Sequence, residues 1–217
     1  MEGLLLAEQL RTFTPLLPST RLSWRFPDPY TFVLALKQGA LWLYNRPPNA
    51  QLSYRDEVPS FGGTHTGFQD LLVARAAGDL VRTEQVKLDR VVHLHFAPFK
   101  GFVETLAVVL VAELTGRNCN LILLDENGTI LGAARDIDSS VNRFRVVRAG
   151  LPYRPPPPYD KLDPRDSSPP DLAALLTGKK LSELRNILDG VGPELTAATA
   201  QLVGVPRNQA LGERDAA

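Results

Sequence analysis

The feature that most constrains the fold is the apolar block from Leu88 to Asp125, which contains three consecutive strand-like segments. The segments VVHLHF (91–96), TLAVVLVAEL (105–114) and NLILLD (120–125) are rich in β-branched residues and leucine, and short linkers with Gly, Asn or Pro separate them. Runs of this kind, bounded by turn residues, predict strands. The middle run is apolar from Leu106 to Ala112, so we expect both faces of that strand to be covered.

The segments around this block predict a mixed α/β domain. An amphipathic pattern over 2–17, stopped by Pro18, predicts a helix, and a Gly-rich loop leads into a second helix over 68–78. Further strands are expected at 21–24, 31–36, 40–45, 51–54, 79–86 and 129–134.

A proline-rich stretch marks the end of this domain. The run Pro155–Pro158 lacks backbone donors and favours extended polyproline geometry, which is typical of a boundary between domains. We place the break near Ser167, which predicts one domain over 1–166 and a second over 167–217.

The second domain is predicted to be helical. Helical spacing is found over 172–177, 181–188 and 194–202, and after Gln209 the sequence is expected to fray. Between the last two helices stand Gly190 and Gly192, followed by a proline at the first helical position, which is the pattern of a helix-hairpin-helix module. Such a turn points backbone N–H groups at a phosphate, although the two glycines could simply close a helix hairpin.

Composition narrows the classes of partner. Lys+Arg and Asp+Glu are both 24, so a nucleic-acid surface must be a local patch rather than a global field. The single cysteine, Cys119, excludes an internal disulfide framework and a multi-cysteine zinc site. Neither a basic leader nor a long apolar segment is found, so we expect a cytoplasmic chain with no membrane partner.

Two polar clusters interrupt the apolar block. At its entrance, Arg90 continues the more apolar face of the strand 91–96, where a guanidinium suits bidentate recognition of phosphate or carboxylate, whereas Asp89 lies on the other face. On sequence alone, the pattern favours a pair that does no more than begin a strand. At the second turn, Arg117, Asn118 and Asn120 supply a dense set of hydrogen-bond donors, although this turn could be an ordinary hairpin loop.

A third concentration of charge follows the block. Five arginines are interleaved with Phe144 and Tyr153, an arrangement that suits phosphate contact and base or ribose stacking. A solvated edge strand explains it as well. The arginines are Arg135, Arg143, Arg145, Arg148 and Arg154.

Catalytic motifs are missing from the sequence. His93 and His95 have a spacing that could supply two metal ligands, but this spacing alone is weak evidence, and we predict no metal site. We find no nucleotide P-loop, no nucleophile elbow and no zinc-protease motif, so we predict no catalytic residue and no cofactor.

Three motifs together resemble the NFACT family, whose bacterial members include ribosome-associated quality-control factors often named fibronectin-binding protein A-like. They are the Asp-Arg pair at 89–90, the E-L-x-G-R-x-x-N turn at 113–120 with its I-L-x-D strand, and the Y-x-P-P-P-x-x-K-x-x-P linker. The resemblance implies an α+β fold with a mixed or antiparallel β-sandwich-like domain similar to the amino-terminal domain of formamidopyrimidine-DNA glycosylases. A helix-hairpin-helix module follows it.

The resemblance also implies a function. Such a protein would bind the large ribosomal subunit carrying an obstructed nascent chain and recruit charged tRNA, alanyl-tRNA in bacteria, for untemplated tailing. Asp89 and Arg90 match the pair tied to tailing, and Glu113 to Asn120 match the family's turn. Nucleic-acid contact is accordingly predicted for ten residues. They are Asp89, Arg90, Glu113, Arg117, Asn118, Asn120, Arg143, Arg145, Gly190 and Gly192.

Two alternatives come from the same resemblance. Formamidopyrimidine-DNA glycosylases use an amino-terminal proline amine as nucleophile, and this sequence begins Met1-Glu2-Gly3, so we expect a non-enzymatic protein. The family's older name suggests adhesion to fibronectin, but no export signal is found. Family members continue into a coiled coil and a carboxy-terminal RNA-binding domain, so the chain is expected to be part of a longer protein.

Overall fold

The computed structural model describes residues 1–101, 104–140, 143–157 and 159–212. It is an α+β structure with two antiparallel sheets. The chain divides into a larger unit, mainly Glu8–Val86 and Arg90–Pro157, and a smaller unit of Glu2–Ala7, Lys87–Asp89 and Pro158–Ala217. Each unit has a hydrophobic cluster of its own.

The first sheet of the larger unit is a four-stranded meander. In β3 the leucines Leu41 and Leu43 are fully buried, whereas Trp42 and Tyr44 between and after them are only half-buried. One face of this sheet therefore packs on the core and the other meets solvent. The strands are β1 (Arg21–Asp28), β2 (Thr31–Leu36), β3 (Gly39–Tyr44) and β4 (Gln51–Arg55), paired in this order.

The second sheet contains the apolar block. All of its strand pairs are antiparallel, and every residue of β8 is buried. The strands are β5 (Leu80–Gln85), β6 (Val91–Phe96), β7 (Val108–Glu113), β8 (Asn120–Leu124) and β9 (Ile130–Ala133), paired in this order. The three strands predicted from the block are thus confirmed as neighbours β6, β7 and β8.

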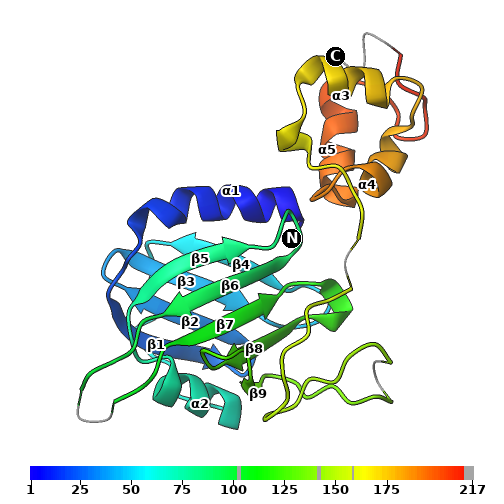
Figure 1. Ribbon diagram of the computed structural model, residues 1–217. Helices are drawn as coiled ribbons and strands as arrows, with labels where there is room; N and C mark the ends of the chain where they lie inside the picture. Colours follow the sequence, from blue (N-terminus) through cyan, green and yellow to red (C-terminus); the bar gives the residue numbers. More distant parts are fainter. Residues whose placement is uncertain (102–103, 141–142, 158, 213–217) are drawn as a thin grey trace. The chain divides into compact units, whose positions relative to one another are not determined.

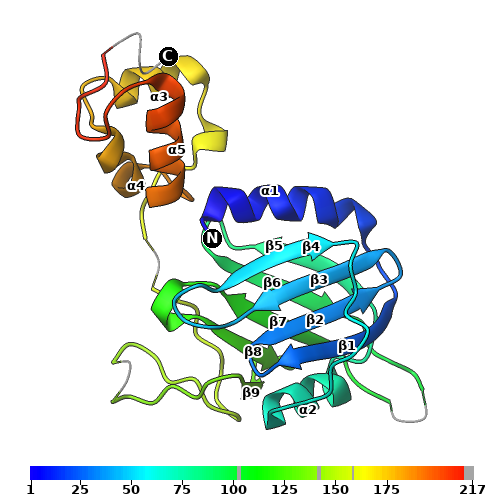
Figure 2. The same ribbon diagram turned by 180° about the vertical axis from the view of Figure 1, so that it is seen from behind.

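The two sheets form the layers of the larger unit (Figures 1 and 2). Trp24 of β1 and Phe96 of β6 stand with their ring centroids 6.0 Å apart, so the inner faces meet in one core. Helix α2 (Gly67–Arg75) packs against both layers. Its Phe68 lies 6.1 Å from the ring of Phe32.

Some expected strand limits are wrong. β7 begins at Val108, and Leu106, expected to be covered on both faces, is 66% exposed. Thr105 pairs instead with Phe99 in an isolated bridge, and the chain enters the sheet only after this bridge. β1 extends to Asp28 past Pro27, which an edge strand tolerates because its outer N–H positions need no partner.

The smaller unit is mostly helical. Its core consists of Leu181, Leu184, Leu188, Val205 and Leu211. The helices are α3 (Pro169–Leu176), a 3-10 turn (Leu181–Glu183), α4 (Leu184–Ile187) and α5 (Pro193–Val203), with a further 3-10 turn before them (Pro164–Asp166).

Two segments of the amino-terminal region and tail differ from expectation. The first helix, α1, spans Gly3–Phe13 and passes into a 3-10 turn, Thr14–Leu16, before Pro18. Fraying was expected after Gln209, but Leu211 is 3% exposed because its side chain completes the core of the smaller unit. Its backbone also forms hydrogen bonds with Gly178 and Lys179. Among the described residues, no helix has the length and apolar character needed to cross a membrane.

Candidate nucleic-acid interface

The polar end of the five-stranded sheet is built around Glu113, the last residue of β7. Glu113 pairs with Val91 on β6 and with Asn120 on β8. This row of paired residues across three strands therefore contains one apolar residue, Val91, and two polar ones. Glu113 and Asn120 are both fully buried. A buried carboxylate is costly unless it is paired and hydrogen-bonded, so this row requires partners from outside the sheet.

Those partners come from the segment that follows β9. The Arg145 guanidinium, 7% exposed as a residue, donates from both of its terminal nitrogens to the Glu113 carboxylate, one bond being 2.5 Å long. Arg145 Nη1 also donates to the Arg154 carbonyl at 3.0 Å, and the Tyr153 hydroxyl donates to Glu113 Oε1 at 2.8 Å. The carboxylate is thus saturated by a bidentate guanidinium and a phenol.

Burial and charge shift the pKa of both partners. Burial alone would lower the pKa of Arg145, but the hydrogen bonds and charge of Glu113 outweigh it and raise the pKa. Burial raises the pKa of the Tyr153 hydroxyl well above its ordinary value, and the Glu113 charge adds to that rise. Both shifts favour the protonated forms of the two partners, a charged guanidinium and a neutral phenol.

Asn120 holds a second part of the same segment. Its Oδ1 accepts from the Arg135 backbone N–H at 3.0 Å, and its Nδ2 donates to the Arg135 carbonyl at 2.8 Å. The Asn120 side-chain amide therefore bonds the Arg135 backbone N–H and carbonyl as the backbone of a neighbouring strand would. The Arg135 guanidinium in turn donates to the carbonyls of Arg117 and Cys119 at 3.3 to 3.4 Å.

Six of the ten predicted site residues, together with Phe144 and Arg154, thus fall into two groups. Glu113, Asn120 and Arg145 are buried and satisfied within the chain, so they hold the segment after β9 against the sheet. A second group is exposed around them. It consists of Arg117, Asn118, Arg143, Phe144 and Arg154.

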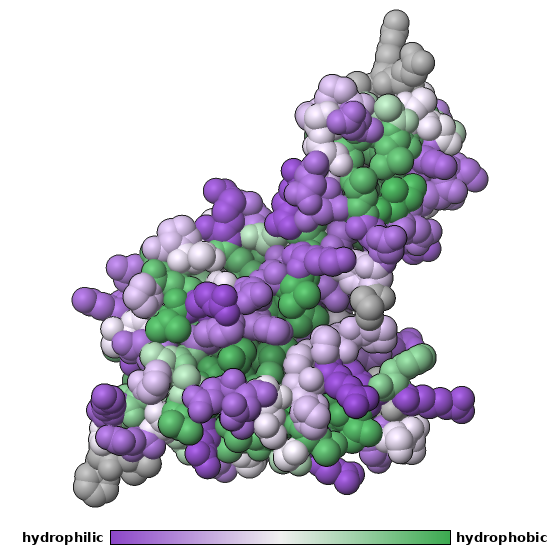
Figure 3. All heavy atoms as spheres, in the orientation of Figure 1, coloured by the Kyte–Doolittle hydropathy of each residue, from purple (hydrophilic) through white to green (hydrophobic). Residues whose placement is uncertain are grey.

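Three residues of the exposed group line a hollow of about 320 Å³. Arg143, Phe144 and Arg154 line it together with Ser139 and Pro152, and Phe144 is 80% exposed. In Figure 3 hydrophilic and hydrophobic residues are interspersed over the face of the larger unit turned to the viewer, with no broad field of one kind. A local patch of arginines beside an exposed ring can contact phosphate and stack on a base.

The Asp-Arg pair is divided between the two units. The Arg90 carbonyl accepts from the Leu114 N–H at 2.7 Å, which places Arg90 beside Glu113 in the larger unit. Asp89 belongs with Lys87 and Leu88 to the smaller unit, and both Asp89 and Arg90 are half-buried. Within the larger unit, the structure therefore brings Arg90 to the Glu113 turn.

The glycine turn of the smaller unit has an occupant. The Glu2 carboxylate accepts from the backbone N–H groups of Gly192 at 2.8 Å, Glu194 at 2.6 Å and Leu195 at 3.1 Å. Glu2 is 7% exposed, and a Cβ at Gly192 would stand 2.4 Å from its Oε1. The donors that the sequence offers to a phosphate are satisfied here by a carboxylate of the same unit.

Sequence reasoning missed Glu2 and also Asp189. Asp189 is 3% exposed, and its carboxylate accepts from the Leu88 N–H at 3.1 Å and from the Tyr159 hydroxyl at 2.7 Å. Glu2 has no motif around it, and Asp189 directly precedes the glycine turn but was not assigned a role there. The only sequence signal was the unsatisfied N-terminus of α5, which requires an acceptor but does not say which.

The histidine pair on β6 is half-buried. Burial lowers the pKa of both His93 and His95, and the rings lie 6.3 Å apart. His93 Nε2 is buried without a hydrogen-bond partner, and His95 Nε2 contacts Arg82 Nη2 at 3.0 Å. Within the described residues, no group of three or more His, Cys, Asp or Glu could hold a metal ion.

The sequence matches a known protein family. Residues 18–216 match the family model described as NFACT N-terminal and middle domains. The Rqc2 homolog RqcH of Bacillus subtilis is 28% identical over 120 residues, which are 54% of this chain and 21% of that protein. The Rqc2 homolog RqcH of Streptococcus suis is 25% identical over 126 residues, 57% of this chain and 23% of that protein. The chain spans about a fifth of the length of these relatives.

Solved structures share the fold. The amino-terminal domain of the fibronectin-binding protein PavA from Streptococcus pneumoniae superposes with a TM-score of 0.79 at 20% identity, covering 94% of this chain and 84% of that one. The amino-terminal part of the fibronectin/fibrinogen-binding protein of Streptococcus suis gives 0.78 at 19% identity, covering 100% and 82%. At these identities the likeness concerns the fold alone.

Proposed function

Because this chain belongs to the NFACT family, we propose that it is the RNA-contacting amino-terminal part of a ribosome-associated quality-control factor. The observation that carries the proposal is the pairing of Glu113 with Arg145, which is buried while arginines on either side of it stay exposed. The ion pair fixes the segment after β9 on the sheet. The exposed arginines around the 320 Å³ hollow are then held in place to meet a polyanion.

The chemistry of the exposed group suits RNA. Guanidinium groups such as those of Arg143 and Arg154 bind phosphate with paired donors. Phe144, 80% exposed, offers a ring on which a base can stack, and Arg117 and Asn118 add donors at the neighbouring turn. An apolar ring that is kept in water next to arginines is more useful to an RNA contact than to folding.

The proposal assigns two kinds of role to the ten predicted residues. Arg90, Arg117, Asn118 and Arg143 contact RNA in the larger unit, and Asp89 contacts RNA in the smaller unit. Glu113, Asn120 and Arg145 position that surface. Gly192 would contact phosphate only after the Glu2 carboxylate leaves the turn, and Gly190 only after its N–H leaves Asp189 Oδ1.

The finer proposal follows the relatives. The whole protein would act in the cytoplasm on large ribosomal subunits and recruit charged tRNA, alanyl-tRNA in bacteria, for tail addition. Its two functional parts would be a glycosylase-like domain over 1–166 and a helix-hairpin-helix module over 167–217. Binding would be its task, and no base-excision chemistry is proposed.

The test measures binding of this chain to tRNA at fixed salt. Arg143→Glu with Arg154→Glu should weaken binding at least tenfold, because two phosphate contacts become repulsive. Lys37→Glu, an exposed reversal in the turn between β2 and β3, is the matched control and should leave the affinity within twofold. Equal losses from both variants would show that the field of the whole chain, and not this surface, attracts tRNA.

A second candidate function is favoured by the names of the structural relatives. The neighbours from Streptococcus pneumoniae and Streptococcus suis are called fibronectin-binding and fibronectin/fibrinogen-binding proteins. Immobilised fibronectin would distinguish the two functions. Saturable binding that Arg143→Glu leaves unchanged would support adhesion through a different surface.

A further inference from the structure

The solvent face of the four-stranded sheet presents aromatic rings. On β3 the buried leucines point into the core, so the residues that alternate with them, Trp42 and Tyr44, point outward. Both rings are half-buried, and Tyr30, in the turn before β2, is 45% exposed. Rings of this size stabilise a fold most when they are buried, so three of them on a solvated face point to a contact outside the chain.

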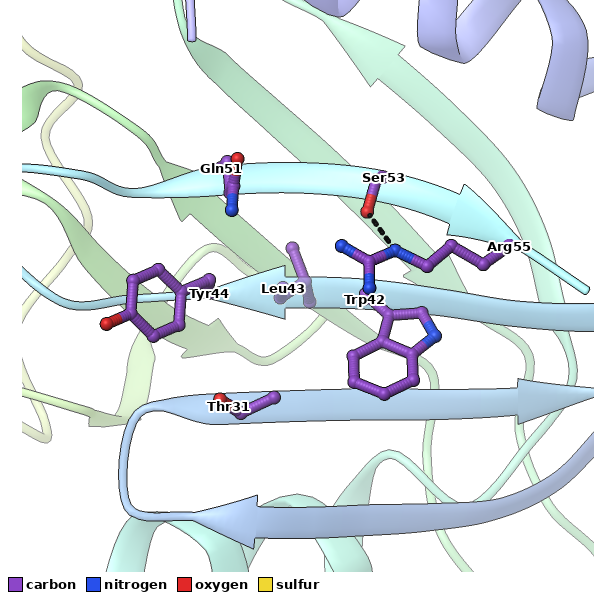
Figure 4. A pocket seen from close by; sticks show the side chains of 7 residues that line it. All are labelled: Thr31, Trp42, Leu43, Tyr44, Gln51, Ser53 and Arg55. Atoms are coloured by element: carbon purple, nitrogen blue, oxygen red, sulfur yellow. Dashed lines mark hydrogen bonds between the residues drawn. The ribbon is translucent and has the colours of Figure 1, made fainter. Parts of the chain in front are cut away.

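Polar side chains surround these rings in a regular register. Trp42 lies opposite Ser53 of β4, and Tyr44 lies between Gln51 of β4 and Thr31 of β2. Together with Arg55 they line a hollow of about 220 Å³ (Figure 4). This volume is below the roughly 300 Å³ at which pockets for drug-sized molecules begin, so it suits a single planar ring rather than a large ligand.

Two arginines cover the ends of the aromatic row. The Arg55 Cζ lies 4.8 Å from the centroid of the Trp42 ring, and Arg55 Nε donates to Ser53 Oγ at 3.1 Å. The Arg46 Cζ lies 5.4 Å from the centroid of the Tyr30 ring. Among the described residues, neither arginine has a carboxylate within ion-pair distance, so both keep their charge for an outside partner.

The indole is also held in a fixed orientation. Trp42 Nε1 donates to the Glu57 carbonyl at 3.0 Å, which uses its only donor, and the Arg55 guanidinium lies over one face of the ring. Arg55 lies over Trp42, and Arg46 lies over Tyr30, which directly precedes the register partner of Tyr44. The two cations therefore stand over different rings of the same face.

We propose that this face binds single-stranded RNA, with a base stacked on Trp42 beside Tyr44 after the Arg55 guanidinium moves from the indole to a phosphate, and with Arg46 on another phosphate of the same strand. Threonine, serine and glutamine side chains in the hollow supply hydrogen bonds to the base edge. The unpaired guanidiniums favour a polyanion over an uncharged sugar, which would also stack on the rings. This site is separate from the surface around Arg143 and does not rest on the function proposed for it.

The chain offers a direct optical test, because its only tryptophans are Trp24, 5% exposed, and Trp42. A short oligouridine, about eight nucleotides long, is titrated into the whole chain while tryptophan emission is followed. Stacking should quench Trp42. The variant Trp24→Phe should retain the quenching, whereas Trp42→Phe, which keeps a ring but leaves only the buried tryptophan, should lose it.

Affinity is measured in parallel with labelled oligouridine. Trp42→Ala should weaken binding about tenfold or more, as expected for loss of one stacked base. Arg55→Glu, which leaves the indole in place, should weaken it as well, whereas Lys37→Glu should not. Arg143→Glu with Arg154→Glu should leave the quenching unchanged, so this site and the proposed tRNA surface can fail independently.

Three outcomes would overturn the inference. They are unchanged affinity in both Trp42→Ala and Arg55→Glu, quenching that survives in Trp42→Phe, and equal quenching by an uncharged oligosaccharide. The last result would identify the face as a sugar-binding platform. Thermal unfolding of each variant shows whether the fold persists, and Arg55→Glu tests the site even if Trp42→Ala does not fold.

Discussion

The carboxylate of Glu2 accepts a hydrogen bond from the backbone N–H of Gly192, at 2.8 Å and across 190 positions of sequence. Two further N–H groups of the first turn of α5 donate to the same carboxylate. This turn has the form of a phosphate site, because unsatisfied N–H groups and the positive end of a helix favour an anion. In this chain the anion is internal, so the turn first serves the stability of the smaller unit.

Replacement of Glu2 should therefore loosen α5. Glu2→Gln removes the charge and places an amide NH₂ against backbone donors, which should cost about 1–3 kcal/mol. Hydrogen exchange at the amides of Glu194 and Leu195 reports the change locally. Glu194→Gln, an exposed acid of the same first turn, is the control. Unchanged protection of these amides in Glu2→Gln would show that water replaces the carboxylate without loss.

Loss of the Glu113–Arg145 pair should destabilise the larger unit far more than loss of its neighbours. Glu113→Ala leaves a buried guanidinium without its carboxylate and should cost about 3–5 kcal/mol in urea unfolding. Tyr153→Phe removes one hydrogen bond and should cost about 1 kcal/mol. Arg143→Ala, exposed beside the pair, should stay within about 0.5 kcal/mol of the parent.

The order of these losses matters more than their size. If Arg143→Ala destabilised the fold as much as Glu113→Ala, the exposed and buried arginines would not have the separate roles assigned here. A double replacement of Glu113 and Arg145 by leucine should recover part of the loss, since it leaves neither charge buried alone. No recovery would mean that packing around the pair, and not its charge, is what the single variant disturbs.

Much of the fold could be predicted because its signals are local. The strands of the apolar block and the helices of the tail follow from hydrophobic periodicity and turn residues. In a strand whose residues are all apolar, however, periodicity does not show which side chains point to the core and which to solvent. In ALWLY every residue is apolar, so nothing in the strand itself shows that Trp42 points to solvent and Leu41 to the core; only pairing with the neighbouring strands fixes this.

The residue types of the candidate site and its turn could be predicted because they are local features of the sequence. The burial of each residue could not be predicted in this way. Arg143 and Arg145 look equivalent in the run NRFRVV, and only the position of that segment against the end of β7 makes one exposed and the other an ion-pair partner. The Glu113–Arg145 and Glu2–Gly192 contacts join residues that are 32 and 190 positions apart, so no local sequence pattern predicts them.

Acid should destabilise the larger unit through His93. Burial lowers the pKa of His93 from its ordinary value of 6.5, and the facing charges of Glu84, Arg82 and Glu113 do not reverse that direction. Above pH 6.5 the ring is neutral in both states, so it has no effect on stability. Below it the unfolded chain takes up the proton first, and the free energy of unfolding falls by at most about 1.4 kcal/mol per pH unit.

His93→Phe removes this proton and also the buried Nε2 that has no partner. Urea unfolding at pH 8 and at pH 5 should therefore show a smaller difference in the variant than in the parent. The same difference in both proteins would assign the acid sensitivity to other groups. His95→Phe is a useful comparison, because burial lowers the pKa of His95 too, but its Nε2 has Arg82 as a partner.

The salt dependence of tRNA binding should show how many phosphates the proposed surface contacts. The formal net charge is zero, so counterion release must come from local groups of cations, such as the few exposed arginines near the hollow. Each neutralised duplex phosphate contributes about 0.9 to the slope of log affinity against log salt, so we expect a slope magnitude of about 2 to 4. Arg143→Glu with Arg154→Glu should lower both affinity and slope, and Lys37→Glu should change neither. Tight binding that ignores salt would mean that tRNA is held by shape and stacking, and that the arginines around Arg145 serve the fold alone.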